Sequence, residues 1–98
     1  MIVEVAVLKV KNGQEALFES DFKTASQYIR SISGYHAHSL LKCMEQENKY
    51  ILWVHWEKLE DHTIGFRQSP QYVHWKELLH HYYEPFPVVE HYQEVSLT

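Results

Sequence analysis

Histidine is the residue type through which this chain could most readily do chemistry, since its 98 residues include eight copies. An imidazole titrates closer to neutral pH than any other side chain and can transfer protons or bind a metal. His62 is expected on a short helical stretch, and His74 on the helix that follows, beside that helix's apolar stripe. Each is a candidate base or ligand at the mouth of a pocket; the alternative interpretation is a half-exposed surface histidine.

Large aromatic side chains flank these two histidines in the sequence. Trp53, Phe66, Tyr72 and Trp75 lie within one short segment, which carries all three Trp residues of the chain. Aromatic residues mixed with His suit a pocket for a flat organic molecule. The same composition also suits an ordinary aromatic core, so these four residues are candidates for pocket walls and no more.

A metal site could draw on His36 and His38, which share one face of a predicted strand. His80 or His81 could supply a third ligand. Only one of that pair could join, because neighbouring helical residues point about 100° apart. No Cys, Asp or Glu stands at a recognisable ligand spacing. Scattered surface histidines explain the pattern better, and we predict no metal site.

Composition excludes several classes of function. The net charge of −4 disfavours nucleic-acid binding, which depends on neutralising phosphates with Lys and Arg. The single Cys43 cannot form an internal disulfide, and the N-terminus lacks the features of a signal peptide. No apolar stretch is long enough to span a bilayer. We therefore expect one cytoplasmic domain over residues 1–98, without a membrane or nucleic-acid partner.

The candidate residues are positioned by a strand and two helical segments. The nearly continuous apolar run at Lys49–Trp56 predicts a strand that is buried on both faces. Leu59–Phe66 is a short helical piece. Ser69 before a proline is typical of a helix N-cap, because its hydroxyl accepts from a free N–H and Pro tolerates the first helical position. A helix over Pro70–Tyr83 follows.

The rest of the chain supplies one more helix and three more strands. An Asn12–Glu15 capping box predicts the start of the first helix, and Gly34 its end through a positive φ. The three strands are predicted at Ile2–Val10, Tyr35–Met44 and Val88–Val95. The resulting β-α-β-β-α-β order is that of a ferredoxin-like α+β domain: a four-stranded antiparallel sheet with both helices on one face.

The pattern of the first and third strands predicts a second copy of the chain. Both strands are apolar on both faces, while the two helices can cover only one face of the sheet. The simplest cover for the other face is a second sheet, packed face to face. We therefore predict a homodimer.

Two groups of residues form a recognisable pattern. One is the opening Met-Ile-Val with the later Leu-Lys-Val-Lys-Asn-Gly; the other contains Trp56-Glu57, His62, Phe66-Arg67-Gln68-Ser69-Pro70 and Trp75. In order and spacing they resemble antibiotic biosynthesis monooxygenase (ABM) domains, which form a dimeric α+β barrel superfamily. The resemblance implies a pocket between helices and sheet. It also implies oxidation of a small quinol- or anthrone-like aromatic without metal, heme or flavin. By that resemblance, His62 and His74 would transfer protons, and Trp53, Phe66, Tyr72 and Trp75 would form walls.

Other activities on the same fold remain open. One alternative is a non-catalytic dimeric module that binds or senses a small molecule; another is an isomerase or a heme-handling relative. The heme-degrading branch carries an Asn, a Trp and an iron-ligating His. Those positions would fall near Ala6, Gly65 and Lys76, with His74 two residues from the last. These three departures disfavour heme degradation.

Overall fold

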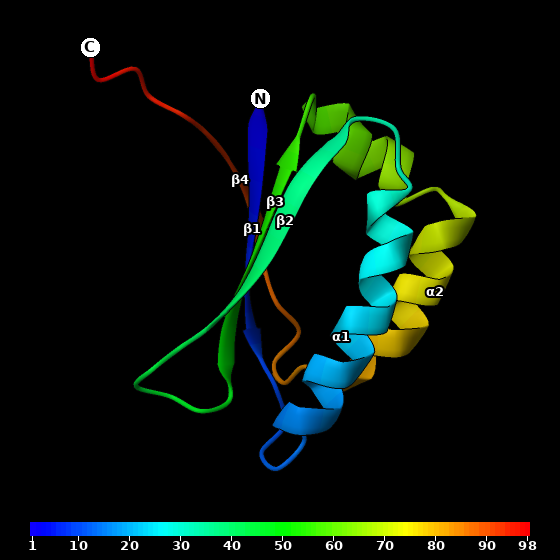
Figure 1. Cartoon of the computed structure of the whole chain (residues 1–98), viewed down its shortest axis with the longest axis vertical. Helices are drawn as coiled ribbons and strands as arrows, with labels where there is room; N and C mark the ends of the chain where they lie inside the picture. The colour runs from blue at the N-terminus through cyan, green and yellow to red at the C-terminus, as the bar shows by residue number, and fades with distance from the viewer.

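The computed structural model describes residues 1–98 as a four-stranded antiparallel sheet covered on one face by two helices (Figure 1). The strand order is β2-β3-β1-β4. The elements in chain order are β1 (Ile2–Lys9), α1 (Glu15–Arg30), β2 (Tyr35–Lys42), β3 (Lys49–Trp56), the π-helix η1 (Asp61–Phe66), α2 (Pro70–Leu79), the 3₁₀-helix η2 (His80–Tyr82) and β4 (Val89–Gln93). The predicted ferredoxin-like α+β architecture is confirmed. No helix has the length and apolar character needed to cross a membrane.

The core lies between the helices and the inner face of the sheet. Strands β1 and β3 pair along their whole length at the centre of the sheet, and their inward side chains alternate with outward ones. Helix α1 contributes an apolar stripe that recurs every three or four residues. The fully buried members of the core include Phe18, Ile29, Tyr50, Val54, Trp56 and Leu79.

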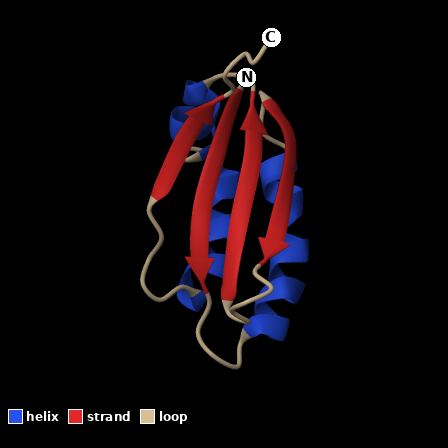
Figure 2. Ribbon diagram, turned by 90° about the vertical axis from the view of Figure 1, so that its left-hand side faces the viewer, coloured by secondary structure: helices blue, strands red, loops and turns tan.

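The outer face of the sheet is apolar and uncovered within one chain. Figure 2 shows the four strands in front and both helices behind them. Val7, Leu41, Trp53 and Tyr92 are between 39% and 51% exposed. The central strands therefore carry apolar side chains on both faces, as their sequence indicates, but only the inner face is buried within one chain.

The ends of the helices follow the sequence signals in part. Ser69 caps α2 as predicted: its Oγ accepts from the N–H of Tyr72 at 3.2 Å, and Pro70 is the first helical residue. Gly34 follows α1 with a φ of +89°. The predicted capping box at Asn12 was wrong: α1 begins at Glu15 behind Gln14, with no side-chain cap. Gly13, at a φ of +85°, turns the chain between Asn12 and the helix.

Several other boundaries also differ from the prediction. Helix α2 ends at Leu79 and tightens into η2, and the strands β2 and β4 stop at Lys42 and Gln93. The prediction that His36 and His38 share a strand face was wrong, because a bulge interrupts the pairing of β2 with β3 between Tyr35 and Ala37. His36 contacts Glu57 at the surface at 2.7 Å, whereas His38 faces Ser26 of α1 at 2.9 Å.

Candidate functional site

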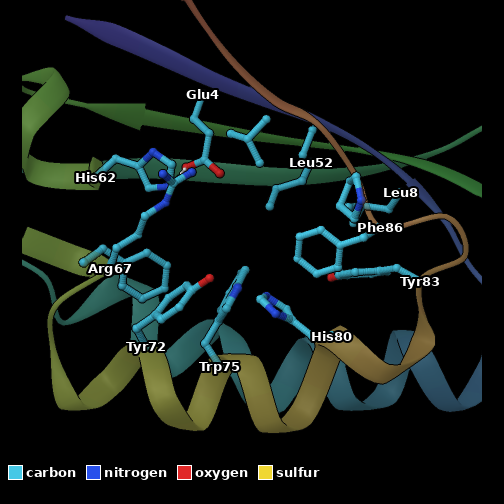
Figure 3. Close-up of a pocket in the computed structure, with 14 residues that line it drawn as sticks. Glu4, Leu8, Leu52, His62, Arg67, Tyr72, Trp75, His80, Tyr83 and Phe86 are labelled. Carbon is cyan, nitrogen blue, oxygen red and sulfur yellow. Dashed lines mark ion pairs between the residues drawn. The ribbon is translucent and has the colours of Figure 1, made fainter. Parts of the chain in front are cut away.

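A cavity of about 340 Å³ lies between the inner face of the sheet, η1 and α2 (Figure 3). Its volume is at the lower end of the range of about 300–1,000 Å³ that is usual for small-molecule sites. Nine of its 14 lining residues are hydrophobic. The polar ones are Glu4, His62, Arg67 and His80, and Tyr72, which is counted among the nine, adds a hydroxyl group.

Glu4 is the one polar side chain that the sheet contributes to the lining of the cavity. It follows the inward alternation of β1, so the strand that buries Ala6 and Leu8 also buries Glu4, which is only 5% exposed. The indole Nε1–H of Trp56 donates to Glu4 Oε1 at 3.0 Å. Burial raises the pKa of the Glu4 carboxyl to about 7, although the Trp56 hydrogen bond and the Arg67 charge both oppose the rise. Near neutral pH this carboxyl can therefore both take up and release a proton.

His62 stands next to Glu4 and is 3% exposed. It projects from η1 and stacks on Trp56, with the rings 5.6 Å apart at 20°. Its Nε2 lies 3.4 Å from Glu4 Oε1, and its Nδ1 lies 2.8 Å from His91 Nε2. Burial above all lowers the pKa of His62 to about 3, with the Arg67 charge and His91 acting in the same direction.

The contact between Glu4 and His62 is therefore not a standing ion pair at neutral pH. With a pKa near 7 for Glu4 and near 3 for His62, the carboxyl holds the proton more readily than the imidazole does. Glu4 and His91 face each other on the paired strands β1 and β4, and His62 contacts both. The three side chains form a continuous polar row from the cavity to the half-buried His91 at the edge of the sheet.

Arg67 supplies the permanent positive charge of the cavity lining. It is the residue directly after η1, and its side chain reaches toward Glu4 and His62 (Figure 3). Burial is the main cause of the lowered pKa values of His62 and His91, and the Arg67 charge lowers them further. An anion formed in the cavity would therefore be stabilised by this guanidinium.

The remaining walls are aromatic and packed edge to face. The ring of Phe66 lies 5.1 Å from that of Tyr72 at 88° and 5.5 Å from that of Trp75 at 79°. On the far side, His80 contacts the rings of Tyr72 and Phe86. Aromatic pairs favour such T-shaped packing, and these rings form the walls of an aromatic slot on the α2 side of the cavity.

Four of the six residues predicted for the site line this cavity: His62, Phe66, Tyr72 and Trp75. The other two do not. Trp53 alternates with the inward Leu52 and Val54, so its indole lies on the outer face of the sheet and is 39% exposed. His74 is exposed on α2 and stacks on Tyr28 of α1 at 4.9 Å, turned about 100° from the inward Trp75.

Sequence reasoning missed Glu4, Arg67, His80 and His91 as residues of the site. For Glu4 a signal exists: it is the one carboxylate inside a nearly unbroken apolar strand, in phase with Ala6 and Leu8. An acidic residue at an inward position needs a partner or a function. The others carry no such signal, because only the packing of β4, η1 and η2 brings them to the cavity.

No group of three or more His, Cys, Asp or Glu side chains in residues 1–98 is arranged to hold a metal ion. The two ring nitrogens of His62 point to different partners, Glu4 and His91, and do not converge with them on one point. Within the polar row, each side chain therefore contacts only its neighbour.

Comparison with known proteins identifies the family. The profile of the antibiotic biosynthesis monooxygenase family matches residues 1–78, and the chain belongs to that family. It is 54% identical over 95 residues to "Uncharacterized protein YczJ" of Bacillus subtilis, covering 97% of this chain and all of that one. Among solved structures, it resembles "Putative antibiotic biosynthesis monooxygenase" of Bordetella bronchiseptica, with a TM-score of 0.92, 33% identity and 97% of each chain covered.

The fold is also that of SnoaB, a cofactor-independent oxygenase from Streptomyces nogalater. The two share a TM-score of 0.72 and 22% identity, over 98% of this chain and 95% of SnoaB. At that identity the likeness concerns the fold.

Proposed function

We propose that this protein is a cofactor-independent monooxygenase that oxidises a small quinol- or anthrone-like aromatic in the cavity between α2 and the sheet. The observation that carries the proposal is the Glu4 carboxyl, which has a pKa near 7 and lies in a cavity that is lined mostly by hydrophobic residues. Membership of the ABM family and the activity named for SnoaB support the same class of reaction.

In the first step, the protein removes one proton from a bound aromatic substrate. Glu4 in its ionised form is the base, and its raised pKa makes it a stronger base than a solvated carboxylate. The substrate becomes an electron-rich anion, and the Arg67 guanidinium stabilises the charge as it develops. Glu4 takes the place of His74, the second base expected from the sequence, in this proposal, because Glu4 lines the cavity and His74 does not.

The oxidation itself balances without a further reductant. For an anthrone-like substrate, the carbanion at the ring CH₂ transfers electrons to O₂ and forms a C–O bond, which gives a peroxide. A proton returns to the peroxide, the O–O bond breaks, and loss of water leaves a ring ketone. The sum is CH₂ + O₂ → C=O + H₂O, in which one oxygen atom enters the product and the other enters water.

The row from Glu4 through His62 to His91 provides a path for the protons of this cycle. Neutral His62 can accept a proton from Glu4 at one ring nitrogen and pass one to His91 from the other. His91 is half-buried at the sheet edge, where solvent can take the proton.

The test is oxygen consumption by the metal-free protein with anthrone and a small panel of quinols, against heat-treated protein. We expect saturable uptake that Glu4→Gln reduces at least a hundredfold, within the usual contribution of general base catalysis. Tyr92→Phe, which alters an exposed hydroxyl on the outer face of the sheet, is the matched control and should keep full activity.

The outcomes separate the oxygenase from a binding module on the same fold. Saturable binding of these aromatics without oxygen uptake would contradict the oxygenase and favour the non-catalytic module. Equal uptake by wild type and Glu4→Gln would leave an oxygenase but refute Glu4 as its base.

A further inference from the structure

We propose that the substrate is an aromatic acid, whose ring system fills the cavity and whose carboxylate binds in a cationic rim outside it. The rim consists of Arg67, Lys76, His80 and His81. This inference rests on the proposed function for the identity of the reaction, but it concerns binding and has its own test.

The residues of the rim line a second hollow, which adjoins the cavity. Its volume is about 550 Å³, and it is more open to solvent than the cavity. Three residues line both spaces: Arg67, Tyr72 and His80. The two spaces therefore adjoin at these three side chains.

The rim follows one face of α2 into η2. Tyr72, Lys76 and His80 are spaced four residues apart, so their side chains lie above one another on the helix. Figure 3 shows Tyr72 and His80 on the α2 side of the cavity and Arg67 at the Tyr72 end, with its side chain reaching toward Glu4. The tightening of α2 into η2 at His80 keeps His81 at the same hollow.

The charges of the rim oppose those of the whole chain. The protein carries a net charge of −4, yet the rim holds two permanent cations, Arg67 and Lys76, against one carboxylate, Glu77. His80 and His81 can donate N–H groups to an anion without being charged. A local positive field on an acidic protein attracts anions to this place rather than to the surface in general.

The donors match a carboxylate in kind and in position. Arg67, which lines both hollows, presents a planar fork of five N–H donors, and this fork suits a carboxylate. Lys76 lies close enough to His80 to help lower the pKa of that histidine, to about 4, although burial is the larger cause. His80 is therefore a neutral donor at pH 7, between the aromatic slot and the lysine.

The experiment compares two probes that differ by one charge: anthraquinone-2-carboxylate and 2-(hydroxymethyl)anthraquinone. Affinity is measured by quenching of tryptophan fluorescence in the full-length protein at low salt. We expect the acid to bind about tenfold more tightly than the alcohol, the effect of one or two charge-assisted hydrogen bonds. Added salt should weaken binding of the acid alone.

Three variants assign the effect to the rim. Lys76→Gln should remove most of the preference for the acid and leave affinity for the alcohol unchanged. Glu77→Gln, which deletes the opposing charge, should strengthen binding of the acid. Lys23→Gln, an exposed lysine of α1 outside the rim, should change neither affinity.

The proposal is overturned if the two probes bind equally, if neither binds, or if Lys76→Gln and Lys23→Gln weaken the acid alike. Oxygen uptake tests the reaction separately. Preferred binding of the acid without turnover would keep the rim and refute the oxygenase. Turnover of neutral aromatics without preference for the acid would keep the oxygenase and refute the rim.

Discussion

Glu4 and His62 show how burial in one largely hydrophobic cavity shifts the pKa values of an acid and a base in opposite directions. Burial penalises whichever form of a group is charged, so it raises the pKa of the Glu4 carboxyl to about 7 and lowers that of His62 to about 3. The two shifts set a carboxyl that ionises near physiological pH beside an imidazole that stays neutral. A carboxyl with a pKa near neutral pH can take up a proton in one step of a reaction and release it in the next.

The first prediction concerns stability against pH. Between pH 4.5 and 7 the unfolded chain loses the Glu4 proton while the folded protein keeps it, so this group makes folding less favourable as pH rises. His62 acts in the other direction: between pH 6.5 and 3 the unfolded chain gains a proton that the folded protein excludes, so stability falls as pH falls. Glu4→Gln should therefore gain stability relative to wild type as pH rises from 4.5 to 7, by up to about 3 kcal/mol.

Urea denaturation at several pH values measures this difference. Glu90→Gln, an exposed carboxylate of β4, is the control and should show no such trend. A constant difference between Glu4→Gln and wild type across this range would show that Glu4 has an ordinary pKa.

The second prediction separates the two histidines that the sequence presents as equals. His62→Gln should lower oxygen uptake about tenfold to a hundredfold, because it interrupts the row between Glu4 and His91. His74→Gln should leave uptake unchanged, because His74 is exposed on α2 and does not line the cavity. Thermal melts of both variants serve as the control for folding. Loss of activity in His74→Gln alone would refute the placement of the site.

The sequence predicts the apolar part of this site better than its polar part. Phe66, Tyr72 and Trp75 could be assigned from their helical spacing, because aromatic residues on an inward stripe must meet the sheet. Trp53 could not be assigned correctly, since a strand that is apolar on both faces gives no sign of which face the helices cover. His91 and Arg67 reach the cavity only through tertiary packing, and local patterns carry no information about it.

At the scale of elements, the junction between α1 and β2 determines where His62 stands. Gly34 has a φ of +89°, and a side chain there would collide with the carboxylate of Asp61, the first residue of η1. Asp61 Oδ2 in turn accepts from the backbone N–H of Lys58 at 2.9 Å. The end of the first helix is thus packed directly against the short helix that carries His62.

The third prediction uses two glycines with nearly the same backbone. Gly13→Ala should cost about 1 kcal/mol, because its φ of +85° strains an alanine but the space around it is open. Gly34→Ala should cost clearly more, since it adds the collision with Asp61 to the same strain. It should also reduce oxygen uptake by displacing η1. Chemical denaturation of both variants measures the difference, and equal costs would mean that the Asp61 contact is unimportant.

The order of elements could be predicted in full from periodicity, while several of their ends could not. Ser69 and Gly34 are local signals whose physics acts within a few residues. The Ser69 cap and the positive φ of Gly34 are confirmed, but Gly34 does not end the helix, because α1 already stops at Arg30. The bulge at His36 and the early end of α2 depend on how neighbouring strands and loops pair. A sequence pattern assumes regular geometry, so it misplaces residues beyond such an irregularity.

The whole molecule leaves one large surface without a partner. The helices and the cavity occupy one face of the sheet, and the other presents Val7, Leu41, Trp53 and Tyr92 to solvent within a single chain. Contiguous apolar surface of this kind marks an interaction site in soluble proteins. A face-to-face pair of sheets would bury it on both copies and would place Trp53, which has no role in the cavity, at the interface.

The last prediction is that the protein is a homodimer in solution and that Trp53 holds it together. Sedimentation at micromolar concentration should give about twice the chain mass of 11.8 kDa. Trp53→Glu places a charge in the middle of the apolar face, so it should raise the dissociation constant at least a hundredfold and yield monomers. Leu17→Glu makes the same kind of change at an exposed apolar residue of α1 and should leave the dimer intact. Since both substitutions lie outside the cavity, a monomeric wild type, or dimers in Trp53→Glu, would refute this face as the interface without bearing on the site.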